Sequence, residues 1–231
     1  MNSLIRSILL AGLGTAVASA ALADGQARFK TADPSLPSLM FSWQTAERSR
    51  LDTPNETAHV LAIDGRAWGV AKVAGHPVSM DLDQLAKLLG QHTALARLGP
   101  DAVVPSQITS LEATGQRETV AGVDGERYRV SWVDSEGNAR IDEAVLTDDP
   151  LVREMQDALL GGMTRAIASG TGVSGHEAAE QELTRRGLAV LRFGDDFRLE
   201  SISDARQPDA RFAMPSQPLD LQQLMRGVMG N

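Results

Sequence analysis

Apolar residues at every second position constrain the fold of this chain more than any other feature of its sequence. Tyr128, Val130 and Trp132 share one face of a strand by this spacing, whereas Arg127 and Arg129 share the other. A strand with one apolar and one polar face is typical of an antiparallel sheet that is buried on one side. The pattern therefore predicts an antiparallel sheet with one buried and one solvated face.

Further short runs follow along the chain, separated by sequences that favour turns. Asp64-Gly65 is the clearest turn, because both residues tolerate a positive φ. We interpret the charged run Glu47–Arg50 as a polar stretch ahead of a turn at Pro54-Asn55. The expected strands cover residues 38–43, 59–63, 67–73, 78–80, 117–121, 126–133, 139–146, 188–193 and 197–202.

Three segments have helical periodicity instead. Residues 81–90 form a short amphipathic helix that Asp81 caps, and a longer helix starts at Asp149-Pro150 and runs to about residue 169. The third, residues 174–187, opens with the S-x-x-E spacing of a capping box. Hairpins interrupted by helices predict an α+β domain, in which a curved antiparallel sheet carries its helices on one face.

The N-terminus has the features of a cleaved secretory signal peptide. Arg6 supplies the positive charge, residues 8–18 are mostly apolar, and Ala21 and Ala23 form a small-residue cleavage site. The apolar segment is too short to span a membrane, so we expect export to the periplasm and no integral membrane span. The expected organisation is a signal peptide (1–23), an extended lead-in (24–37), one domain (38–215) and a C-terminal tail, with a possible short helix, over 216–231.

Composition narrows the function classes. The 231 residues carry a formal net charge of −8, which argues against nucleic-acid binding because such binding depends on clustered Lys and Arg. Cysteine is absent, so the exported protein has neither disulfides nor a catalytic thiol. Its stability must come from an ordinary hydrophobic core.

Motifs that resemble catalytic or cofactor sites have structural explanations here. Gly170–Gly175 matches G-x-G-x-x-G but follows a helix, whereas dinucleotide binding requires a preceding strand. His176-Glu177 resembles the start of a zinc-protease motif, yet Glu180 stands where the second histidine is needed. We therefore predict no metal, no cofactor and no catalytic residue, and leave open a hydrolase whose site is visible only in three dimensions.

Aromatic and methionine side chains give the best positive candidate for a site. They lie on expected strands and on the stripe of the helix after Pro150, where they either pack together or line an apolar cavity. The candidate ligand-binding residues are Trp43, Trp68, Tyr128, Trp132, Met155 and Met163.

Several short motifs occur in an order that resembles a known family. They are Thr119–Gly122, Asp148–Pro150, Gly187–Val190 and Phe212–Pro215, and they resemble uncharacterised bacterial exported proteins of the domain of unknown function 4412 type. The stretch from Trp43 to Arg66 is similar to the start of the wider LolA-like group. Family members often carry a cysteine where this chain has Gly125, so no disulfide is inherited.

The resemblance implies an unclosed half-barrel sheet with helices in its mouth. The LolA-like group includes periplasmic lipoprotein carriers, an outer-membrane receptor and a stress-signalling regulator. By this analogy we expect a soluble periplasmic, non-enzymatic protein that binds a lipid, an acyl chain or a lipid-anchored protein. The alternative is a protein-interaction module in envelope sensing or assembly, with a fully packed interior and an envelope protein as partner.

Overall fold

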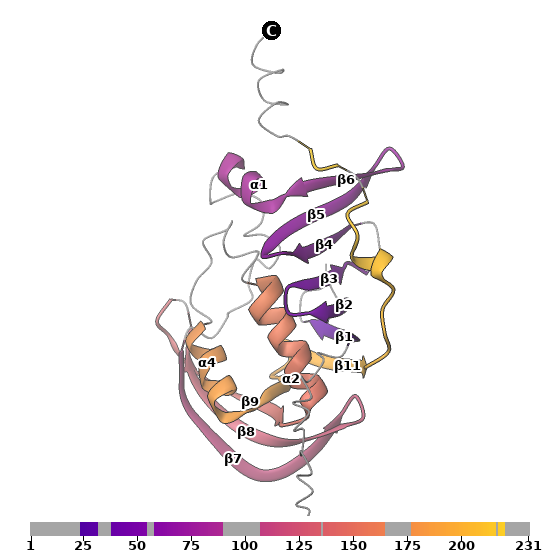
Figure 1. The fold of residues 1–231 in the computed structure, drawn as a ribbon. Coiled ribbons are helices and arrows are strands. Elements are labelled where there is room, and N and C mark those ends of the chain that lie inside the picture. The colour runs from indigo at the N-terminus through magenta and orange to yellow at the C-terminus, as the bar shows by residue number, and fades with distance from the viewer. Residues whose placement is uncertain are drawn as a thin grey trace, which may run out of the picture.

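A computed structural model describes residues 24–31, 38–54, 58–89, 107–134, 136–164, 177–215 and 217–219. Within them, one antiparallel sheet of eleven strands runs in the order β6-β5-β4-β3-β2-β1-β11-β10-β9-β8-β7. Because this order is linear, the sheet is not closed, and β6 and β7 are its edges. Figure 1 shows that the sheet is strongly curved. The strands are β1 (Gly25–Thr31), β2 (Ser38–Thr45), β3 (Arg48–Asp52), β4 (Ala58–Ile63), β5 (Arg66–Val73), β6 (His76–Asp81), β7 (Gln107–Val120), β8 (Val123–Val133), β9 (Ala139–Thr147), β10 (Ala189–Phe193) and β11 (Phe197–Ser203).

The first strand lies in the middle of the sheet. β1 pairs with β2 on one side and with β11 on the other, so it joins the N-terminal and C-terminal halves of the fold. The segment expected as an extended lead-in thus contains a central strand. Its signal was the alternation of Ala27 and Phe29, both buried, with the exposed Arg28 and Lys30.

Turn chemistry sets the register of the hairpins. Asp64 and Gly65 have φ angles of 51° and 74° and join β4 to β5, as the Asp-Gly pair predicts. The charged run 47–50, in contrast, contributes to a strand that the sequence did not reveal. Three of the five residues of β3 are charged. Its Asp52 is buried, and the Asp52 carboxylate forms ion pairs with Arg50 and Arg211.

Five helical segments accompany the sheet in the described residues. They are α1 (Leu82–Leu89), α2 (Pro150–Gln156), the π-helix η1 (Asp157–Thr164), α4 (Glu177–Arg186) and the 3-10 helix η2 (Asp209–Phe212). Asp81 caps α1 by accepting hydrogen bonds from the backbone N–H groups of Asp83 and Gln84, at 2.9 and 3.2 Å. The segment expected as one α-helix after Pro150 changes to π-helix at Asp157.

A C-terminal strap, residues 204–215, lies against the face of β2 and β3 that is opposite α2. Trp43 of β2 contacts α2, whereas the adjacent Ser42 accepts a hydrogen bond from the Arg211 guanidinium at 2.9 Å. Arg211 also pairs with Asp52 at 2.7 Å, and Phe212 is buried. Figure 1 shows this segment running from the end of β11 beside the N-terminal strands.

Most of the buried apolar residues in the described part of the chain belong to two clusters. The larger lies between the sheet and α2–η1, and the smaller lies beneath α4. Among the described residues, no helix is both long and apolar enough to cross a membrane. The expected α+β class is therefore confirmed at the level of one curved, unclosed antiparallel sheet with a few helices.

Candidate functional site

Helix α2 and its π-helical continuation carry the apolar stripe that the sequence predicts. Asp149 fixes the start, because its carboxylate accepts hydrogen bonds from the N–H groups of Leu151 and Val152 at 3.0 and 3.1 Å. About two turns apart along the stripe, Met155 and Met163 are each only 1% exposed. The two methionines belong to the larger core cluster, as does Trp43. The structure thus brings together three of the six candidate residues.

Trp43 connects the sheet to this helix. Its side chain is fully buried and stacks on Phe41 with ring centroids 5.7 Å apart. The indole N–H donates to the Glu154 carboxylate of α2 at 3.3 Å. Phe41 in turn lies 6.4 Å from the ring of Phe29 on β1. A continuous aromatic surface therefore lies under α2–η1.

The π-helix is the least regular part of this assembly. π-Helical turns are rare and occur frequently at functional sites. The segment contains Gly161-Gly162, and glycine has low helix propensity. Met163 lies beyond the glycine pair and is still buried, so the segment is held by its contact with the sheet.

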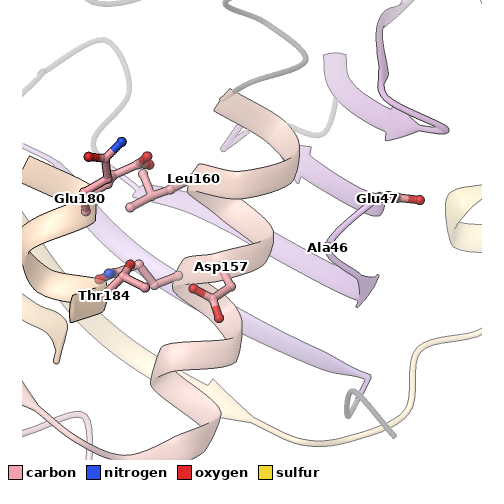
Figure 2. Close-up of a pocket in the computed structure, with 8 residues that line it drawn as sticks. Ala46, Glu47, Asp157, Leu160, Glu180 and Thr184 are labelled. Carbon is pink, nitrogen blue, oxygen red and sulfur yellow. The ribbon is translucent and has the colours of Figure 1, made fainter. Parts of the chain in front are cut away.

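A pocket of about 330 Å³ opens beside η1, between that helix, α4 and the turn from β2 to β3. Figure 2 shows Asp157 and Leu160 of η1, with Glu180 and Thr184 of α4, around this pocket. Burial raises the pKa of Asp157, and the nearby Arg153 partly opposes the rise. The pocket is an acidic opening at the edge of the apolar core.

Tyr128 and Trp132 lie in the smaller cluster instead. Trp132 packs edge-on against Phe193 at 5.9 Å, and its indole N–H donates to Asp142 at 2.8 Å. Leu183 of α4 covers the cluster. The structure therefore separates these two candidates from Trp43, Met155 and Met163.

Trp68 belongs to neither cluster. It is half-buried on β5, and the Arg66 guanidinium lies 5.6 Å from its ring. The predicted cleavage alanines, Ala21 and Ala23, lie outside the described residues, as does the segment 165–176 with its glycine motif and His176.

Sequence reasoning missed the residues that complete the site. Phe29 lies in the segment that the sequence predicts as an extended lead-in, although its alternation with charged neighbours is a strand signal. Glu154 and Asp157 resemble ordinary helix-surface acids, and only the fold places them at the edge of the core. Among the described residues, no three histidine or acidic side chains converge to hold a metal ion.

Comparison with protein-family models, with curated proteins and with solved structures found no match to this chain. The case for the candidate site therefore comes from the geometry of this structure alone.

Proposed function

We propose that this protein is an exported, non-enzymatic LolA-like half-barrel that binds a lipid or acyl chain between the sheet and α2–η1. The observation that carries the proposal is the aromatic surface of Phe29, Phe41 and Trp43, covered by a helix that ends in π-helix. The signal-peptide pattern and the resemblance of the motifs support periplasmic location and the half-barrel assignment. A lipid-anchored protein would present the same acyl chemistry.

Binding on this proposal requires α2–η1 to move. Trp43, Met155 and Met163 are each at most 1% exposed, so an acyl chain has to replace these mutual contacts with its own. Methionine suits such exchange, because its unbranched side chain adapts to irregular neighbours. The pocket beside Leu160 and Asp157 is the proposed entrance, where the headgroup would remain in contact with water.

Single-tryptophan variants and a fatty acid brominated in mid-chain test this site, because bromine quenches an indole only near contact. One variant keeps Trp43 and carries Trp68→Phe and Trp132→Phe. The matched variant keeps Trp132 and carries Trp43→Phe and Trp68→Phe. We expect the brominated acid to quench Trp43 and to leave Trp132 unchanged, since the two indoles lie in different clusters.

The unbrominated acid and circular dichroism of both variants provide the controls. Quenching of Trp132 alone would move the ligand to the smaller cluster and refute the site. No quenching in either folded variant, together with native mass spectrometry that shows only the apo mass after periplasmic purification, would refute acyl binding altogether.

The filled interior favours one alternative function. If α2–η1 never leaves the sheet, the domain is a rigid interaction module for an envelope protein, and the near-zero exposure of Trp43 and Met155 reflects plain core packing. Cross-linking in the periplasm then captures a protein partner, and the brominated acid quenches neither indole.

A further inference from the structure

A second cavity, of about 520 Å³, lies apart from the α2–η1 site, between β7–β9 and the C-terminal end of α4. Its floor is formed by backbone and buried side chains, including Gly125, Leu146 and Thr147. Register places Arg117 opposite Glu126 on the adjoining strands, so both side chains emerge on the face that bounds the cavity. A volume of this size is typical of sites for small ligands.

The cavity offers guanidinium groups. Arg186, at the end of α4, is held in place by Glu182 at 2.7 Å and by the backbone carbonyl of Leu111 at 3.3 Å. The Arg117 side chain is exposed, and among the described residues its guanidinium makes no hydrogen bond or ion pair. A guanidinium without a protein partner is well suited to bind a carboxylate with two parallel hydrogen bonds.

The same cavity offers acceptors for a cation. The Asp148 side chain is exposed and, within the described part of the chain, its carboxylate forms no hydrogen bond or ion pair. The Glu126 carboxylate accepts a hydrogen bond from the Tyr128 hydroxyl at 3.4 Å, and burial together with the Glu126 charge raises the pKa of Tyr128. The C-terminal end of α4 adds the negative end of a helix dipole.

We propose that this cavity binds a small zwitterion of amino-acid or dipeptide size. Arg117, supported by Arg186, would take the ligand carboxylate, and Asp148 with Glu126 would take its ammonium group. A fatty acid does not fit this arrangement, because it lacks an ammonium group and the rim is charged. The proposal is independent of acyl binding under α2–η1.

Calorimetric titration of the exported full-length protein tests the proposal with four probes: alanine, dialanine, acetyl-dialanine amide and ethylamine. We expect binding of alanine or dialanine, and the stronger of the two identifies the ligand size. Arg117→Gln and Asp148→Asn should each weaken that binding by at least about 10-fold, the usual effect of losing a hydrogen bond to a charged group. Lys72→Gln, which changes an exposed cation on β5, is the matched control and should have no effect.

Three results would overturn the zwitterion site. The first is that the uncharged acetyl-dialanine amide binds as tightly as the better of alanine and dialanine. The second is that ethylamine does so. The third is that Lys72→Gln weakens binding as much as Arg117→Gln does. The proposal would also be overturned if none of the four probes gave a heat of binding. None of these results bears on the quenching of Trp43, so the failure of one proposal is distinguishable from the failure of the other.

Discussion

Gly25→Ala tests the packing of β1 against the candidate site. A Cβ at residue 25 would lie 2.2 Å from Cζ2, 2.5 Å from Cη2 and 2.6 Å from Cε2 of the Trp43 indole. All three distances are below any real contact, so the indole must move. It has no free space, because it is fully buried and stacked on Phe41. Overpacking of this kind costs about 1–3 kcal/mol, and loss of the bond to Glu154 adds about 1 kcal/mol.

We therefore expect Gly25→Ala to lower the free energy of unfolding by about 2–4 kcal/mol, and Tm by roughly 5–15 °C. Urea unfolding followed by circular dichroism measures this change. The control is the same substitution in a Trp43→Phe background, because phenylalanine lacks the indole atoms that collide. There the cost should fall below about 1 kcal/mol, since alanine otherwise suits a strand better than glycine. An equal cost in both backgrounds would show that Gly25 does not contact Trp43, and the register of β1 with β2 would be wrong.

Two further predictions concern His59 on β4 and Asp52 on β3, which pairs with Arg211 of the C-terminal strap. His59 has a folded-state pKa of about 4, lowered from 6.5 by burial and by Arg50, so the unfolded chain takes up its proton first as pH falls. Stability should thus decline between pH 6.5 and 4, by about 1–2 kcal/mol at this half-buried position, and His59→Asn should remove that part of the decline in urea titrations across pH. Asp52→Asn leaves Arg50 and Arg211 without their shared carboxylate, so the free energy of unfolding should fall by about 2–3 kcal/mol. Proteolysis within residues 204–215 should increase. If the strap stays as resistant to protease as in the unmodified protein, the ion pairs do not hold it.

The strands were predictable where one face is apolar and the turn is specific. The Asp64-Gly65 hairpin and the alternation around Tyr128 show this, because each depends on local chemistry that any tertiary context preserves. β3 was not predictable, because the carboxylate of Asp52 is buried by Arg211, 159 residues away. Such a strand has no apolar period, and only the folded chain supplies its partner.

The candidate site was predictable only in part for a related reason. Period and composition correctly place Met155, Met163 and Trp43 among apolar side chains, but they carry no information on which strands become neighbours. Trp132 and Trp43 have the same sequence signal, yet they belong to different clusters. Sequence identifies the residues of a core, and the topology of the sheet divides them between cores.

That division gives the two proposed sites different physical requirements. The site under α2–η1 is apolar and filled, so a ligand can enter it only if the helix is displaced. The hydrogen bond from Trp43 to Glu154 holds that helix on the sheet. The zwitterion cavity is already open and charged, so it binds without rearrangement of the core. Acyl binding should therefore be slow and should expose α2–η1 to hydrogen exchange, whereas zwitterion binding should be rapid and leave that exchange unchanged. Faster exchange in α2–η1 on addition of dialanine would contradict this separation, because it would show that α4 transmits occupation of the cavity to the larger core.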